Sequence, residues 1–294
     1  SGEGELPARP ENRERLIMAT SDVKELERIA RRLRLDVVEM TSAAGSGHPG
    51  GSLSSADLMA VLYFGGTMKH DPSNPSWEGR DRFVLSKGHV APVLYAALAE
   101  SGYFPREELL TLRKLGSRLQ GHPVRGKVPG VEMSTGSLGQ GLSMACGIAL
   151  AGKMDGKDYR TFCLLGDGEL QEGQNWEAAM FASQYGLSNL IAFVDRNRLQ
   201  ITGNTEDAVG LDPLPEKWKA FGWNVIVIDG HDIAMIQEAI AKATEPGNRP
   251  VAVIMNTIKG KGVSFMENNV SFHGKAANSE ELDEAVRELT EESE

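Results

Sequence analysis

Cysteine is almost absent from this chain, whose 294 residues include only Cys146 and Cys163. Two thiols exclude a disulfide-rich scaffold, and nothing in their spacing indicates a redox pair. Both lie inside apolar runs, so we expect buried, reduced thiols, which favours a cytoplasmic location.

Positive charge is also scarce, because 31 lysines and arginines face 41 acidic residues and leave a net charge of −10. Since no basic cluster opposes that charge, the composition argues against nucleic acid as a partner. A short basic run, Arg31-Arg32-Leu33-Arg34, falls in a helical pattern, and we interpret it as a solvated helix face.

Long apolar segments are missing as well, and the chain shows no signal-peptide pattern, so we predict no membrane partner. The composition, 40% hydrophobic and 24% charged, is that of a globular protein with an ample core. Neither a repeat nor a linker divides the chain. We predict an N-terminal arm over residues 1–20, a main domain over 21–278, and an acidic C-terminal helix or tail over 279–294.

Short apolar runs and helical patterns alternate along the main domain. The runs that predict buried strands cover residues 83–85, 162–165, 190–194, 225–228 and 251–255. Helices are predicted over 22–40, 54–64, 138–154, 172–185 and 233–243, with a glycine-rich loop over 46–52. This alternation indicates an α/β fold with a doubly wound, mainly parallel sheet and helices on both faces. Ligands of such sheets bind at the carboxyl ends of the strands.

Two of these strand ends carry oxygen ligands. Asp167, within Gly166-Asp167-Gly168, follows one strand, and Asn197 follows the next. A carboxylate and an amide oxygen suit a magnesium ion that also holds phosphate oxygens. Gly168 lets the backbone approach a diphosphate, and the helix after it is expected to aim its N-terminal amides at negative charge. The pattern predicts a site for a metal ion and a diphosphate.

The histidines are the second informative feature. A lone histidine in a loop is usually a surface residue, but several beside glycines at element ends favour a ligand cleft. We expect four of the six to line one: His48, His89, His122 and His273. His231, before a predicted helix cap, and His70, in a polar loop, are interpreted as structural.

A second glycine-rich loop, residues 135–141, opens a predicted helix. It lacks the lysine of a phosphate-binding P-loop and follows no clear strand, so it is not a dinucleotide fingerprint. We interpret it as a wall for a flat cofactor ring.

Taken in order, these segments resemble the N-terminal half of transketolase, a thiamine diphosphate enzyme. The matching segments are residues 46–51, 80–89, 121–123, 136–141 and 166–173. The resemblance extends from about residue 22 to residue 275. It implies the thiamine-diphosphate-binding fold and a ketol-transferring enzyme.

The resemblance also assigns roles to residues. It implies that Asp167, the side chain of Asn197 and the backbone carbonyl of Leu199 bind the metal, which is Mg²⁺ or alternatively Ca²⁺ or Mn²⁺. The residues that it implies for cofactor binding are His89, Gly136, Ser137, Leu138, Gly168, Asn197, Lys259 and His273. Catalysis at the ketose donor falls to His48, His122 and His273, since imidazoles exchange protons near neutral pH. Lys275 is expected to add positive charge, and Glu172 to lie at a subunit interface.

Transketolases also carry a pyrimidine-binding module and a C-terminal module, and this chain ends before either. The leading hypothesis is therefore the N-terminal subunit of a split transketolase, working with a C-terminal subunit in an α2β2 assembly on sugar phosphates of the pentose phosphate pathway. The alternatives are a subunit of another thiamine diphosphate enzyme (a sugar-phosphate synthase or 2-oxoacid dehydrogenase component), part of a longer enzyme, or a non-catalytic relative. The acidic end after Ser279 favours a natural terminus. The sequence does not specify the sugars.

Overall fold

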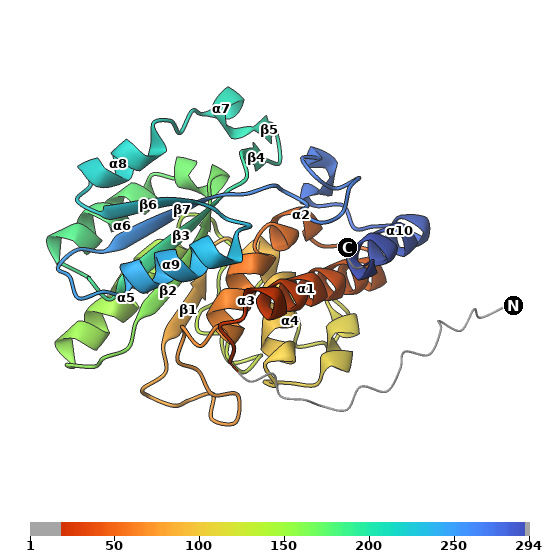
Figure 1. Cartoon of the computed structure of the whole chain (residues 1–294), viewed down its shortest axis with the longest axis horizontal. Coiled ribbons are helices and arrows are strands. Elements are labelled where there is room, and N and C mark those ends of the chain that lie inside the picture. The colour runs from red at the N-terminus through yellow and green to blue at the C-terminus, as the bar shows by residue number, and fades with distance from the viewer. Residues whose placement is uncertain (1–18, 292–294) are drawn as a thin grey trace, which may run out of the picture.

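Five parallel strands form the central sheet of the computed structural model, which describes residues 19–291 (Figure 1). The strand order is β1–β2–β3–β7–β6. The strands are β1 (Arg82–Leu85), β2 (Thr161–Gly166), β3 (Leu190–Arg196), β6 (Asn224–Asp229) and β7 (Val251–Asn256). Each includes one of the five predicted apolar runs. A short antiparallel hairpin, β4 (Leu199–Gln200) and β5 (Gly203–Asn204), follows β3.

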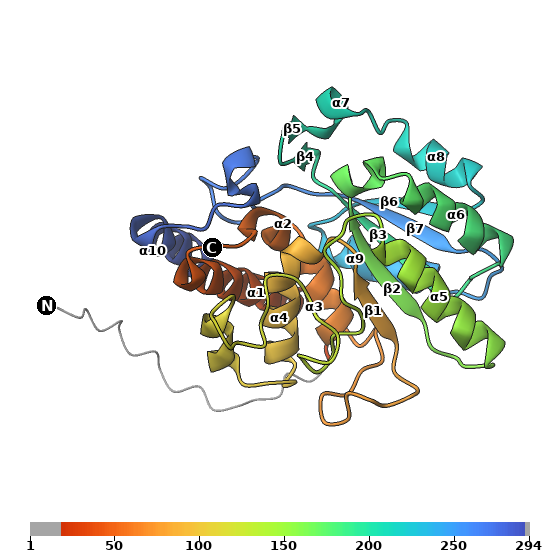
Figure 2. The same cartoon turned by 180° about the vertical axis from the view of Figure 1, so that it is seen from behind.

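Helices cover both faces of the sheet, which confirms the doubly wound α/β prediction (Figures 1 and 2). One face packs against α5 (Gly141–Met154), α6 (Gln174–Gln184) and α8 (Leu214–Ala220). The other faces a core with α1 (Val23–Ala44), α3 (Ala56–Phe64), α4 (Ala91–Glu100) and α9 (Ile233–Ala243). In β2, Cys163 and Leu165 face the first core while Phe162 and Leu164 face the second, as strand alternation requires.

Shorter elements connect these layers. They are α2 (Pro49–Leu53), α7 (Thr205–Ala208) and the 3₁₀ turns η1 (Gly88–Val90), η2 (Arg106–Thr111), η3 (Gly168–Gln171) and η4 (Val270–His273). α2 replaces most of the loop predicted over residues 46–52. Pro49 fixes the backbone for a first helical turn, and the Ser52 hydroxyl donates to the carbonyl of His48 at 2.8 Å.

The interpretation of the basic run as a fully solvated face is wrong for Arg34. Its side chain is buried in α1, where it pairs with the buried Asp57 of α3 and donates to the carbonyl of Leu53 at 3.2 Å. The partner lies on a different helix, so the helical pattern alone did not reveal the burial. Burying an arginine requires such a paired charge.

The last described helix is α10 (Ser279–Thr290), as the acidic pattern predicted. Asn278 caps it in a capping box with Glu281, and Ala285 and Leu289 bury against the core that contains α1. Most of the predicted arm and the last three residues lie outside the described residues, so the domain division stays a prediction. Among residues 19–291, no helix is both long and apolar enough to span a membrane.

Candidate active site

The carboxyl ends of β2 and β3 bring the predicted metal ligands together. The Asp167 carboxylate accepts hydrogen bonds from the backbone N–H of Gly168 at 2.8 Å and of Arg198 at 2.5 Å. The Asp167 N–H in turn donates to the carbonyl of Asp195 at 3.2 Å. Burial, and then the negative charge of Asp195, raise the pKa of Asp167 to about 6. The positive charge of Lys259 and the two backbone N–H groups oppose this rise but do not cancel it.

Asn197 and Leu199 contribute oxygen atoms beside Asp167. The Asn197 side-chain nitrogen donates to Asp195 at 3.1 Å, while its oxygen accepts from the Leu199 N–H at 3.1 Å. The Leu199 carbonyl accepts from the ammonium group of Lys259 at 3.3 Å. A carboxylate, an amide and a carbonyl oxygen form a hard donor set, which suits Mg²⁺ or Ca²⁺ and not a soft metal.

Other metal centres are absent from the described residues, which hold no group of three or more histidine, cysteine or acidic side chains placed to bind an ion. The predicted set differs from such a group, because Asp167 is its one acidic ligand. Lys259 is buried beside it, and burial lowers the pKa of its ammonium group to about 8.

Four histidine rings converge next to this edge, from four separate segments. The ring centroid of His48 lies 5.2 Å from that of His89, 5.6 Å from that of His273 and 6.4 Å from that of His122. His89 and His273 stack at 5.3 Å. The structure thus groups all four histidines predicted to line a cleft.

The imidazoles of this cluster favour their neutral forms. Burial, and then the positive charge of Arg113, lower the pKa of His48 to about 4, while burial, and then the charge of Lys259, lower that of His273 to about 3. Burial also holds the pKa of His89 well below its ordinary value, and that of His122 below it. Neutral imidazoles can both accept and donate protons near pH 7.

Several buried polar atoms at this site lack a hydrogen-bond partner within the described residues. They are His48 Nδ1, His273 Nδ1, Thr135 Oγ1 and Gln200 Oε1. Buried polar groups in native proteins are nearly always paired, so these four atoms are available to a polar ligand. Unpaired buried atoms also occur among the described residues away from the site, for example in Asp36 and Trp218. Together with the hard oxygen donors beside Lys259, the four atoms at the site fit a metal-bound diphosphate cofactor.

The glycine-rich loop over residues 135–141 closes one wall of the cluster. Gly136 has a φ of 143°, and a Cβ there would lie 2.8 Å from the His122 ring. On its other side, a Cβ on Gly88 would lie 2.7 Å from the backbone nitrogen of Gly136. Only glycine permits both approaches. Ser137 and Leu138, the other predicted cofactor contacts of this loop, are exposed.

The segment after Asp167 differs from the prediction. A helix was expected to direct its N-terminal amides at the diphosphate, but the 3₁₀ turn η3 intervenes and α6 begins at Gln174, not at Glu172. The buried Glu169 explains the turn, because its carboxylate accepts from the N–H groups of Gly166 and Gly139, both at 3.0 Å. The amide of Gly168 itself points at Asp167.

Two other residues of the prediction lie at the edge of the site. Lys275 pairs with Glu281 of α10 at 2.5 Å, and Glu172 is exposed. The structural interpretations of the remaining histidines agree with their contacts. His231 bonds Asp57 at 2.7 Å, and His70 bonds the carbonyl of Tyr63 at 2.8 Å.

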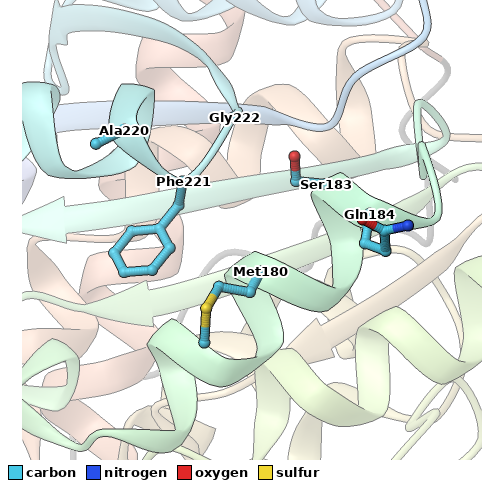
Figure 3. A pocket seen from close by; sticks show the side chains of 6 residues that line it. All are labelled: Met180, Ser183, Gln184, Ala220, Phe221 and Gly222. Atoms are coloured by element: carbon cyan, nitrogen blue, oxygen red, sulfur yellow. The ribbon is translucent and has the colours of Figure 1, made fainter.

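A surface hollow of about 470 Å³ between α6 and the end of α8 contains none of these groups (Figure 3). Its lining residues are Met180, Ser183, Gln184, Ala220, Phe221 and Gly222. No ionisable side chain lines it, so we assign it no chemistry.

Two cations at the site had no predicted role. Lys87 is buried against Asp195, and Arg113 lies beside the loop of His48. Lys87 belongs to a segment that the resemblance already covered, whereas Arg113 stands outside every matched segment. Its partner Ser46 is 67 positions away in sequence, so only the fold reveals the contact.

Known proteins identify the class of this α/β domain. A family model described as "Transketolase, thiamine diphosphate binding domain" matches residues 24–293. The chain belongs to the transketolase family and carries its thiamine diphosphate-binding domain.

Relatives of two lengths are similar to the chain. The 6-deoxy-6-sulfo-D-fructose transketolase subunit of Clostridium sp. (strain MSTE9) is 47% identical, over 92% of this chain and 97% of the relative. An apulose-4-phosphate transketolase subunit of Phocaeicola vulgatus is 44% identical, over 92% and 95%. Transketolase of Homo sapiens is 45% identical, but the chain spans only 42% of it. The crystal structure of Campylobacter jejuni transketolase superposes with a TM-score of 0.87 at 35% identity, over 91% of this chain and 43% of that one.

Proposed function

We propose that this chain is the diphosphate-binding subunit of a two-subunit transketolase, which transfers a two-carbon ketol unit from a ketose phosphate to an aldose phosphate. The observation that carries the proposal is the convergence of four neutral imidazoles beside a hard-oxygen sheet edge. Family membership supports the cofactor, thiamine diphosphate. Bound there, it would supply a nucleophilic carbon for chemistry at the ketose carbonyl.

In this proposal the sheet edge holds the metal and the diphosphate. Asp167, Asn197 and the Leu199 carbonyl bind the ion, and these three hard oxygens suit Mg²⁺ or Ca²⁺. His89, His273 and Lys259 would donate hydrogen bonds to the phosphate oxygens. Gly168, whose N–H donates to Asp167, contributes the close backbone approach that a residue without a side chain permits. Gly136, Ser137 and Leu138 contact the cofactor ring.

Three imidazoles act on the sugar, and one of them, His273, also binds the diphosphate. His48 and His273 each have a buried, unpartnered Nδ1 in the described residues, and both rings are neutral near pH 7, so each keeps a nitrogen lone pair to accept a hydrogen bond from a donor hydroxyl. His122 stands on the exposed side of the cluster and donates a hydrogen bond to the reacting oxygen.

A partner chain completes the reaction centre in this proposal. The two relatives that this chain spans over 95% and 97% of their length are named as transketolase subunits, whereas the chain spans 42% of human transketolase. We infer a C-terminal partner subunit, an α2β2 assembly with Glu172 at an interface, and a cytoplasmic location suited to two free thiols. The relatives' names differ in their sugars, so the donor is to be found by assay.

Reconstitution tests the function. The purified chain is mixed with a candidate C-terminal subunit from the same organism, thiamine diphosphate and Mg²⁺, and ketol transfer between sugar phosphates is followed. We expect activity only in the mixture, with a stable complex in size-exclusion chromatography. Assay with 2-oxoacid donors separates the other thiamine diphosphate enzymes. A complex that binds the cofactor but transfers no ketol unit from any ketose would refute the proposal.

A further inference from the structure

Arg113 occupies a backbone conformation that an arginine adopts at a cost. It lies just after η2 with a φ of 59°, and its N–H donates to the carbonyl of Leu119 at 2.9 Å. Left-handed backbone favours glycine or asparagine, because other side chains crowd the carbonyl. Strained positions of this kind concentrate at functional sites. The strained backbone is therefore consistent with a functional role for the arginine side chain.

That side chain touches the two loops that carry His48 and His122. Its Nη1 donates to the Ser46 hydroxyl at 3.2 Å, two positions before His48. The guanidinium also lies against Gly121, the residue before His122, where a Cβ would come within 2.7 Å of Cζ. Glycine at 121 is thus what allows the planar group to rest on that turn.

The charge of Arg113 is uncompensated within the described residues, which provide it no ion pair, and the residue is exposed. The groups that face His48 are the rings of His89, His122 and His273 and the cations Lys259 and Arg113. Those that face His122 are His48 and Arg113, while the Tyr95 hydroxyl donates to its carbonyl at 3.3 Å. Within residues 19–291, no carboxylate opposes the arginine at either ring.

We propose that Arg113 is a positioning residue, which fixes the loops of His48 and His122 relative to each other and presents a positive charge to both imidazoles. In consequence both rings stay neutral and ready to accept protons, because a neighbouring cation disfavours the imidazolium form. The inference rests on the proposed function, in which these two rings serve the sugar.

The first test uses the chain alone. Histidine side chains labelled with ¹⁵N are titrated by NMR in the wild type and in Arg113→Asn, Arg113→Lys and Lys114→Gln. Asparagine suits the left-handed backbone and removes the charge, lysine keeps the charge, and Lys114 is an exposed neighbouring cation that serves as the matched control. His48→Gln and His122→Gln variants assign the two resonances.

In Arg113→Asn, we expect the pKa values of His48 and His122 to rise by about half a unit or more. They should stay near the wild-type values in Arg113→Lys and Lys114→Gln. Unshifted His48 and His122 in a folded Arg113→Asn chain would overturn the electrostatic role. If that variant does not fold, Arg113→Gln with the same titration replaces it.

The second test uses the reconstituted enzyme. Arg113→Asn should move the acid limb of kcat/KM to higher pH, while Arg113→Lys should keep that limb but lower kcat, because it loses the planar contact with Gly121. Ser46→Ala, which keeps the charge and loses the hydroxyl, should also lower kcat without moving the limb. If Arg113→Asn, Arg113→Lys and Ser46→Ala all kept the kcat of the wild type, the positioning role would be overturned. Shifted histidines in a complex without ketol transfer would instead contradict the proposed function alone.

Discussion

The ammonium group of Lys87 lies against the carboxylate of Asp195, and both side chains are buried. Asp195 also accepts from the Ser54 hydroxyl at 2.7 Å and from Asn197 at 3.1 Å. The pair therefore supports both the helix that follows His48 and the amide predicted to bind the metal. Lys87 keeps the pKa of Asp195 below its usual value despite complete burial.

Removing Lys87 should leave a buried charge without its partner. We expect Lys87→Met to lower the free energy of unfolding by about 3 to 5 kcal/mol, measured by urea denaturation. Lys242→Met is the matched control, because Lys242 forms an exposed ion pair with Glu238 at 2.7 Å. That loss should be much smaller, because an exposed ion pair contributes little to stability. Similar losses in both variants would show that the buried pair contributes no more than a surface one.

Asp167 is the acidic group of the predicted metal site. Asp167→Asn keeps its shape but removes the charge, so Mg²⁺-dependent binding of thiamine diphosphate should weaken by at least about 100-fold. Calorimetry on the complex with the partner subunit measures this, with Asp283→Asn, an exposed change on α10, as the control. Unaltered cofactor affinity would rule out the metal role of Asp167.

Acid should destabilise the chain through its histidines. In the folded state the pKa values are about 4 for His48 and about 3 for His273, below the ordinary value of 6.5, so the unfolded state binds more protons between these limits. The contribution of these histidines to the free energy of unfolding is fully present above about pH 6.5 and falls as the pH drops toward 4. The fall should be less than about 1.4 kcal/mol per pH unit for each histidine, because both rings are partly solvated.

Urea midpoints at pH 7 and pH 5 test this dependence. The drop between them should be smaller in His48→Gln and His273→Gln. His70→Gln, outside the cluster, should also reduce the drop, because burial lowers the pKa of His70 as well. A pH dependence that persists unchanged in the first two variants would assign the acid sensitivity elsewhere.

Gly136 sets the spacing between the glycine-rich loop and His122. Gly136→Ala should lower kcat of the reconstituted enzyme by about 100-fold, because the new methyl group displaces the ring. Gly147→Ala, in the interior of α5 with nothing within 4 Å of its Cβ, should instead stabilise the lone chain by about 0.5 to 1 kcal/mol. Full activity in Gly136→Ala would mean that the ring tolerates the shift.

Buried parallel strands were the elements that the sequence predicted best. Runs such as 190–194 are apolar on both faces, and the structure extends this one only to Arg196. In contrast, α4 was missed because almost every residue in it is apolar and buried, which leaves no helical period to detect. Strand ends and loop histidines could be placed together from topology, since parallel strands end at one edge.

Contacts between distant segments could not be predicted in the same way. Arg34 has the sequence context of a surface helix, and only the packing of α3 supplies Asp57. Likewise, the turn over Gly168 depends on Glu169 bonding the loop at Gly139, 30 positions away. Such pairings are set by the assembled fold, so local periodicity carries no information about them.

Because β7 lies between β3 and β6, the central sheet can be completed only late in synthesis of the chain. Lys259 and His273 follow this strand, which is the last of the sheet to be synthesised although it pairs in the middle. A nascent chain that stops before residue 251 would leave β3 with an open hydrogen-bonding side, a surface that invites aggregation. Premature termination in this gene should therefore yield insoluble fragments, and not a weakened enzyme.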